Sequence, residues 1–404
     1  MPISVPFRTL LPSFTRIGFV LALALSAAPD ASAADTERRR LSTTDLSAAN
    51  QQNEELRKLA HEARLESITK LKDLLKEGTF EGDTKAELIL RLSDLYFQEG
   101  RDLYLDEMRL CTAEIDKVFN AGGSPDSVDC KTYTTGSREW QDRSIKLYKQ
   151  ILSVYPQFAR ADQATFFLAS AYNDTGEKDL AAQEFTRLVK VYPDSEYVTD
   201  SYVLIGEYYF EEKSEANKAM LAYKKAATNK THEKYPFAMY KLAWCYYNLG
   251  EAGQAISTMK IVVSYADSAA GNKSNIQLQD EALKDLVRFF ADGGDMEEAI
   301  AYFKQIGKQN LINDLLKKLA STFIEQGKFE QAIEMYRRLI TDSPTAPVAA
   351  DFQNQIIEAY TKMGKKEETL QEIDRLRTTY GKQSSWARAN ASNQDAVKSA
   401  GEMI

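Results

Sequence analysis

The sequence predicts an all-α protein made of repeated antiparallel helix pairs, because the same residue types return in register five times between residues 172 and 376. In each copy an aromatic residue is followed four positions later by glycine, and a small residue stands five positions after that glycine. Bulky apolar residues follow at offsets of four and three, which is helical spacing. The copies begin at Tyr172, Tyr246, Phe290, Phe323 and Tyr360.

Each copy contains the signals for two helices joined by a tight turn. Thr165, Leu168 and Ala169 precede the first aromatic residue at spacings that place them on one helix face. Glycine adopts the left-handed backbone conformation that ends many helices, and short polar turns such as residues 176–179 then begin a second helix. A helix pair of this kind is half exposed until the next pair stacks on it. We therefore expect about seven stacked pairs.

The pattern of small residue, aromatic residue, alanine and proline resembles the tetratricopeptide repeat family. Pro156, Pro193 and Pro344 are expected to end second helices, although the tryptophan that is usual in first helices is missing. The long links between pairs resemble those of Gram-negative cell-envelope repeat proteins, such as the periplasmic division coordinator and the outer-membrane assembly lipoprotein. The resemblance covers roughly residues 84–380 and implies a right-handed superhelical solenoid whose first helices line a concave groove.

The first 33 residues predict a cleavable secretory signal. Arg8 and Arg16 flank the apolar run Ile17–Ala28, and Ala31–Ala33 has the small residues of a cleavage site. An uncleaved anchor is the alternative, but the run is shorter than the roughly 20 residues that span a bilayer. Because no cysteine follows the run, we expect no lipid attachment. The mature chain is then periplasmic, with no membrane span.

Composition excludes one class of partner. The formal net charge is −8, and an acidic chain is repelled by nucleic acid. We therefore expect protein partners in the cell envelope and no nucleic acid. The sequence leaves the oligomeric state open.

The remaining chain divides into segments with different patterns. The third repeat has residues 211–217 in place of a glycine turn, so its turn is expected to be one residue wider. The first repeat is expected to have a helix that reaches Gly100, followed by an insertion made of a further helical stretch at 101–120 and a polar loop. This insertion is either a binding element or decoration. We prefer a capping role over a short coiled coil for the leader helix. The predicted segments are a linker and leader helix at 34–80, a divergent first repeat at 84–156 with its insertion at about 101–137, the repeat array at 162–380, and a polar or capping segment at 381–404.

Cysteine and histidine usage favours a protein without catalysis, metal or cofactor. Cys111 and Cys130 bracket the insertion and either stay free or form a disulfide, which would close a loop of about 20 residues worth roughly 3 kcal/mol. Cys245 is expected to be a buried free thiol. Only His61 and His232 occur, and no metal-binding spacing or phosphate-binding glycine loop is present.

The family resemblance implies which residues face the groove. Exposed aromatic residues in a groove usually mark an interaction site, but packing could also cover them. The basic residues occupy positions resembling those of carboxylate-clamp repeats. The asparagines of that clamp are missing, so we expect a general anionic contact. The groove residues are Phe166, Asn173, Phe210, Tyr240, Trp244, Tyr247, Lys284, Arg288 and Lys317.

These inferences together predict a non-catalytic periplasmic scaffold that binds a protein or peptide segment within a cell-envelope assembly. Cell-wall and division machinery, outer-membrane assembly and envelope motility machinery are the candidate assemblies. One alternative is an accessory module that presents substrate to a glycan-processing enzyme. The other is a purely architectural spacer, in which the groove aromatics are packed.

Overall fold

The computed structural model describes residues 43–268, 273–306 and 309–404, and helices are the only regular secondary structure in them. The predicted signal at 1–33 and the start of the linker lie outside the described residues. None of the described helices combines the length and the apolar character needed to cross a membrane. The chain divides into two compact units between Tyr197 and Val198, and each unit is described by itself.

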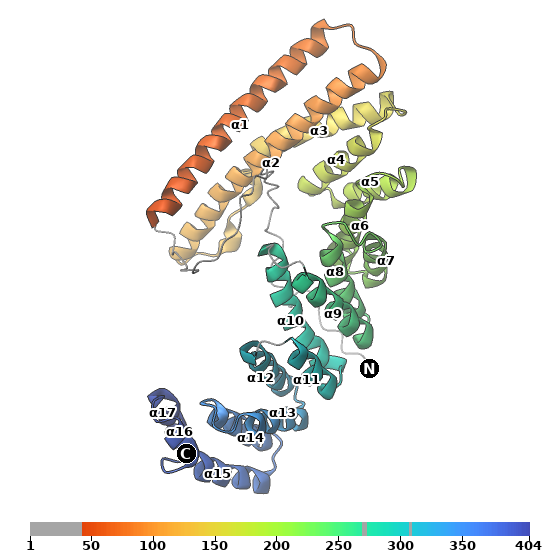
Figure 1. Cartoon of the computed structure of the whole chain (residues 1–404). Helices are drawn as coiled ribbons and strands as arrows, with labels where there is room; N and C mark the ends of the chain where they lie inside the picture. The colour runs from red at the N-terminus through yellow and green to blue at the C-terminus, as the bar shows by residue number, and fades with distance from the viewer. Residues whose placement is uncertain (1–42, 269–272, 307–308) are drawn as a thin grey trace, which may run out of the picture. The chain divides into compact units, whose positions relative to one another are not determined.

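Unit 1 begins with a long helical hairpin, α1 against α2 (Figure 1). Ile68 of α1 packs against Leu92 and Tyr96 of α2. Glu99 of α2 is 3 % exposed and accepts a hydrogen bond of 2.7 Å from Arg64 of α1. The leader helix therefore covers the first helix pair. The elements of unit 1 are α1 (Thr43–Glu77), α2 (Gly82–Asn120), the 3-10 turns η1 (Pro125–Ser127) and η2 (Cys130–Thr132), α3 (Thr135–Val154), α4 (Ala161–Asp174) and α5 (Lys178–Val191).

The helical stretch expected at 101–120 is continuous with the helix of the first repeat, because α2 runs through Gly100 to Asn120. Gly100 is buried where α2 crosses α3. A β-carbon at this position would stand 2.9 Å from Nε2 of Gln141 on α3. The glycine thus permits close approach of two helices and makes no turn.

The inserted segment after α2 is held to that helix at two points. Cys111 of α2 and Cys130 of η2 form a disulfide, with their α-carbons 5.5 Å apart. The carboxylate of Glu107 on α2 accepts hydrogen bonds from the backbone N–H groups of Gly136 and Ser137, at 3.0 and 3.2 Å, where α3 begins. The carboxylate occupies the position of an N-terminal cap for α3.

Unit 2 stacks five helix pairs, which with α2–α3 and α4–α5 make seven in the described chain and confirm the predicted all-α repeat fold. The repeated aromatic columns form its core: Phe290 and Phe323 on first helices, Phe303 and Tyr336 on second helices. The pairs of unit 2 are α6 (Val198–Glu207) with α7 (Ala216–Ala226), α8 (Tyr235–Asn248) with α9 (Ala252–Ser268), α10 (Lys273–Gly293) with α11 (Met296–Gln305), α12 (Gln309–Glu325) with α13 (Phe329–Asp342), and α14 (Ala349–Lys362) with α15 (Lys366–Tyr380).

The C-terminal segment packs onto the last pair as α16 (Ser385–Ala389) and α17 (Gln394–Met403). Trp386 is 1 % exposed and lies against Ala350 and Tyr380. Its indole N–H donates a 2.7 Å hydrogen bond to the backbone oxygen of Ala346. The segment therefore covers the apolar surface that the last pair would otherwise expose.

The turns follow the predicted glycine column with one exception. Gly176, Gly250, Gly327 and Gly364 have φ between 71° and 84°, the left-handed conformation that the helix ends require. Gly294 does not adopt it. There α10 ends at Gly293, and the carboxylate of Asp295 caps α11 instead.

The third repeat has no glycine at its turn and reverses the chain direction in a different way. A π-helical turn, η3 (Tyr208–Glu212), follows α6 and takes up the additional residue between the aromatic and alanine columns. Ser214 then adopts the left-handed conformation with φ of 55°, the only non-glycine residue in the described chain with positive φ. This conformation costs an L-residue roughly 1–2 kcal/mol.

Replacing Ser214 with glycine is therefore expected to raise the free energy of unfolding by about 0.5–1 kcal/mol, because relief of the backbone cost exceeds the added flexibility of glycine in the unfolded chain. Urea unfolding followed by circular dichroism measures the change. Ser257 on the exposed face of α9 provides the control, since Ser257→Gly is expected to destabilise by about 0.5 kcal/mol. A loss of stability in both variants would contradict the account of the turn.

Candidate functional site

Predicted groove residues of unit 2 gather where α8 meets α10. Tyr240, Trp244 and Tyr247 are spaced so that they share one face of α8. Asp285, Arg288 and Asp292 share one face of α10 in the same way. Side-chain hydrogen bonds and ring contacts join the two faces. We call these six residues the α8–α10 cluster.

Two carboxylates of α10 hold the polar atoms of the aromatic residues on α8. The hydroxyl of Tyr240 donates a 2.6 Å hydrogen bond to Oδ2 of Asp285, and the indole N–H of Trp244 donates to the same oxygen at 3.1 Å. Seven residues further along both helices, the hydroxyl of Tyr247 donates to Asp292. The two tyrosine–aspartate bonds fix α8 and α10 in register.

Arg288 lies between these two bonds and orients the rings. Its Nε–H donates to the hydroxyl of Tyr247 at 3.2 Å. Its guanidinium carbon lies 5.8 Å from the ring centre of Trp244 and 5.6 Å from that of Tyr247, within the range of a cation–π contact. Tyr247 also stacks on Phe289, with 4.6 Å between the ring centres. The rings are therefore held in one arrangement before any partner binds.

Burial controls the protonation of the cluster. It raises the pKa of Asp285, although the hydrogen bonds from Tyr240 and Trp244 and the nearby charge of Arg288 act against this rise. Burial and the contact with Asp292 raise the pKa of Tyr247 to about 12. Burial and the charge of Asp285 likewise raise the pKa of Tyr240. Both tyrosines are hydrogen-bond donors at physiological pH.

The expectation that Phe210 and Trp244 present their rings to solvent is wrong. Phe210 is 3 % exposed, because the π-helical turn directs it into the core, where the ammonium of Lys241 lies over its ring. Trp244 is 9 % exposed, packed edge-on against Tyr247 and Phe289. Tyr240 and Tyr247 are half-buried. Packing therefore covers two of the aromatic residues that were predicted to line the groove.

Two predicted groove residues, Phe166 and Asn173, belong to unit 1. Phe166 stacks on Tyr197, with 4.6 Å between the ring centres. The side-chain oxygen of Asn173 accepts a 2.8 Å hydrogen bond from Lys178. Both side chains are therefore engaged within their own unit.

The predicted basic residues of unit 2 form no ion pair with a described carboxylate. Lys284 and Lys317 are exposed and Arg288 is half-buried, and none of them has a carboxylate within 4.0 Å in the described part of the chain. Ion pairs do join second helices of unit 2, from α9 to α11, from α11 to α13 and from α13 to α15. These pairs are Lys260–Glu298, Arg338–Glu297, Lys304–Asp342 and Arg337–Glu372, at 2.6 to 3.3 Å.

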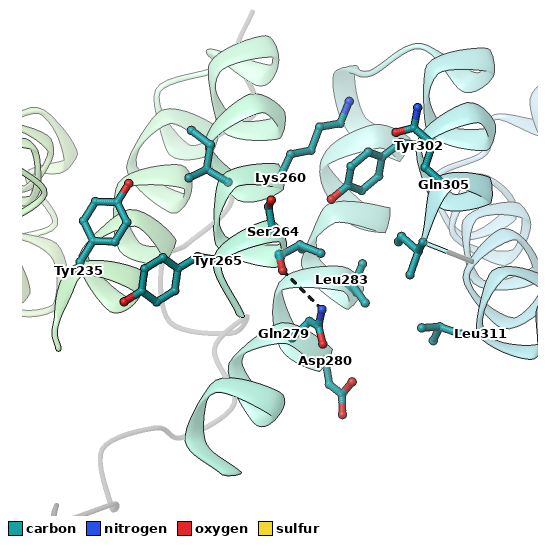
Figure 2. A pocket seen from close by; sticks show the side chains of 13 residues that line it. Tyr235, Lys260, Ser264, Tyr265, Gln279, Asp280, Leu283, Tyr302, Gln305 and Leu311 are labelled. Carbon is teal, nitrogen blue, oxygen red and sulfur yellow. Dashed lines mark hydrogen bonds between the residues drawn. The ribbon is translucent and has the colours of Figure 1, made fainter. Parts of the chain in front are cut away.

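A separate hollow of about 650 Å³ lies between α9, α10 and α11 (Figure 2). Here α9 packs against α10, whereas α11, with 10 residues against the 21 of α10, is long enough to pair with only half of it. The ammonium of Lys260 lies 4.7 Å from the ring centre of Tyr302 and pairs with Glu298, so its charge is compensated. No predicted site residue lines this hollow. The described residues contain no cluster suited to a metal ion.

Sequence reasoning missed the carboxylates of the cluster. Asp285 and Asp292 resemble ordinary surface residues until α10 is placed against α8. A signal was present, since the two aspartates stand seven residues apart, as do Tyr240 and Tyr247.

Comparison with known proteins identifies the repeats. Two models of the tetratricopeptide repeat match residues 142–196, 237–268 and 316–346. These ranges contain α4, α5, α9 and α13 and parts of α3, α8 and α12. No curated protein matches the chain in sequence.

The chain also matches solved structures, and three of them are the following. MamA is 20 % identical, with 49 % of this chain and 96 % of that chain covered and a TM-score of 0.31. PilW, a widely conserved type IV pilus biogenesis factor, is 17 % identical, with 59 % and 94 % covered and a TM-score of 0.32. The apo form of RapI is 16 % identical, with 75 % and 72 % covered and a TM-score of 0.39.

Proposed function

Because this chain is an all-α solenoid built of tetratricopeptide repeats, we propose that it is a non-catalytic scaffold that holds a segment of a partner protein. Such repeats bind protein partners. The segment lies on the first helices of unit 2, at and beside the α8–α10 cluster. The observation that carries this proposal is the gathering of half-buried tyrosines and Arg288 in one hydrogen-bonded arrangement on two first helices.

The arrangement suits binding because its order exists before the partner arrives. Tyr240 and Tyr247 have their hydroxyls bonded to carboxylates, so little side-chain freedom is left to lose on association. Tyrosine and arginine are the residue types that most often dominate the energy of interfaces. The unpaired charges of Lys284 and Lys317 flank the cluster on the same helix faces.

We place this scaffold in the periplasm, as part of a cell-envelope assembly. The signal-like residues 1–33 support export. The disulfide between Cys111 and Cys130 supports an oxidising compartment, where such bonds persist. Cell-wall and division machinery, outer-membrane assembly and envelope motility machinery all offer partners of this kind. N-terminal sequencing of the protein recovered from the periplasmic fraction tests the placement, and an intact Met1 there or a purely cytoplasmic protein would contradict it.

An architectural spacer is the second candidate, and the burial of Phe210 and Trp244 favours it. A spacer needs packed aromatics but no partner on its first helices. An accessory module of a glycan-processing system would instead bind an enzyme and present its substrate.

In-cell photo-crosslinking separates these functions. A photoreactive residue replaces Asn248, which is exposed next to Tyr247 at the end of α8, and a matched probe replaces Ser257 on the exposed face of α9. We expect a discrete adduct with one protein from position 248 and none from position 257. Mass spectrometry of the adduct names the partner, and an enzyme that acts on glycan would support the accessory role.

A third probe at Phe119, which is 65 % exposed on the inserted part of α2, tests the other surface. An adduct from position 119 alone would move the working surface to the insertion and refute the role of the α8–α10 cluster. If none of the three positions gives an adduct, the architectural spacer is the function that remains.

A further inference from the structure

The first helices α10, α12 and α14 carry their groove charges in two rows. The aromatic columns Phe290, Phe323 and Tyr360 set these helices in register. In all three helices a carboxylate stands nine residues before the aromatic residue. The position six residues before the aromatic residue holds lysine in α10 and α12 and asparagine in α14. The acidic row is Glu281, Asp314 and Asp351, and the basic row is Lys284 and Lys317, continued by Asn354.

The two rows lie side by side on the surface opposite the core. Residues three apart on a helix share a face and rise by about 4.5 Å along the axis, so the rows are about one turn apart. Asp314, Asp351, Lys284 and Lys317 are exposed, and Glu281 is half-buried. None of these five residues forms an ion pair within 4.0 Å in the described chain.

The rows run across neighbouring helices. Lys328, just after α12, donates a 3.2 Å hydrogen bond to the backbone oxygen of Asp292 on α10, which shows that these two helices are adjacent. The charge of Lys317 on α12 lowers the pKa of Asp351 on α14, although burial raises it overall. The basic row on α12 therefore lies beside the acidic row on α14, and the shared register of the aromatic columns continues each row from helix to helix.

We propose that the partner segment held by unit 2 is a helix with segregated charge, which lies across α10, α12 and α14. One flank of its contact face carries acidic side chains that meet Lys284 and Lys317. The other flank carries basic side chains that meet the acidic row. This inference rests on the proposed function and specifies the chemistry of its partner.

Two properties of the surface favour such a segment. A polyanion such as nucleic acid or an anionic lipid surface meets repulsion from the acidic row, and a polycation meets repulsion from the basic row. A segment that carries both signs in two lines satisfies both rows, and complementary charges of this kind give specificity more than raw affinity. The rows also set direction, because a segment turned end for end places like charges opposite each other.

Reversal of each row tests the inference, with the adduct formed from position 248 as the readout. The basic row is reversed by Lys284→Glu with Lys317→Glu, and the acidic row by Glu281→Lys with Asp314→Lys. Each reversal is expected to reduce the adduct at least tenfold. The control is Lys318→Glu with Lys366→Glu, two exposed lysines outside the rows, and this pair is expected to leave the adduct unchanged. Circular dichroism confirms that each variant folds.

The cross-linked peptide supplies an independent readout. Its sequence is expected to form a helix with acidic and basic residues on separate lines. Reversal of the partner's acidic line to basic residues is expected to restore the adduct in the Lys284→Glu, Lys317→Glu variant. An adduct that neither row reversal changes would overturn this inference while the proposed function stands. If the protein with native rows gives no adduct, both this inference and the proposed function are overturned.

Discussion

Replacement of Asp285 with alanine is expected to lower the free energy of unfolding of unit 2 by about 2–3 kcal/mol, because the change leaves one buried and one half-buried donor without an acceptor. Tyr240 and Trp244 both donate to this carboxylate, at 2.6 and 3.1 Å. Urea unfolding gives the total loss. Hydrogen exchange is expected to show weaker protection in α8 and α10, where the lost bonds lie.

Asp280 provides the matched control, since it is exposed five residues earlier on the same helix. Asp280→Ala is expected to change stability by no more than about 0.5 kcal/mol. Equal losses in the two alanine variants would show that the α8–α10 cluster contributes nothing beyond ordinary surface contacts.

Asp285→Asn separates the hydrogen bonds from the charge. The amide oxygen of asparagine still accepts from Tyr240 and Trp244, so its loss is expected to be smaller than that of the alanine variant. Burial raises the pKa of Asp285 above its usual 3.8, so the folded state binds the proton more tightly than the unfolded state. The native protein therefore loses stability relative to Asp285→Asn as the pH rises from about 3.8 through the raised pKa. A difference that stays constant across this range would contradict the burial of a charged carboxylate.

Removal of the disulfide by Cys111→Ser with Cys130→Ser is expected to cost about 3 kcal/mol of unfolding free energy in unit 1. The bond joins residues 19 apart in sequence and closes the inserted segment onto α2. Without it the unfolded chain gains the freedom of an open loop. Denaturant unfolding measures the loss, and hydrogen exchange is expected to place it in the second half of α2 and in residues 121–134.

Reducing agent supplies the internal control for this prediction. It is expected to destabilise the native protein by the same amount and to leave the double serine variant unchanged. The adduct from position 248 in unit 2 is expected to persist in that variant. A double variant as stable as the native protein would mean that Glu107 and the loop contacts alone hold the insertion.

The repeat architecture follows from the sequence alone, because it depends on short-range chemistry. Helical spacing, the glycine turns at Gly250 and Gly327, and prolines after second helices are properties of neighbouring residues, and they recur often enough to identify the fold. The same register predicted that Tyr240, Tyr247 and Arg288 belong to one surface of the first helices, and the structure brings them together between α8 and α10.

Contacts between helices determined features that the position of a residue within its repeat does not predict. Gly100 stands four residues after Tyr96, as the turn glycines do after their aromatic residues, but α2 continues through it and Gln141 of α3 packs against it. The π-helical turn buried Phe210, since one additional residue rotates the end of a helix relative to its start. Asp285 became a hydrogen-bond acceptor only because α10 lies against α8. Local pattern therefore determined which helices form, and contacts between helices determined which side chains are left to meet a partner.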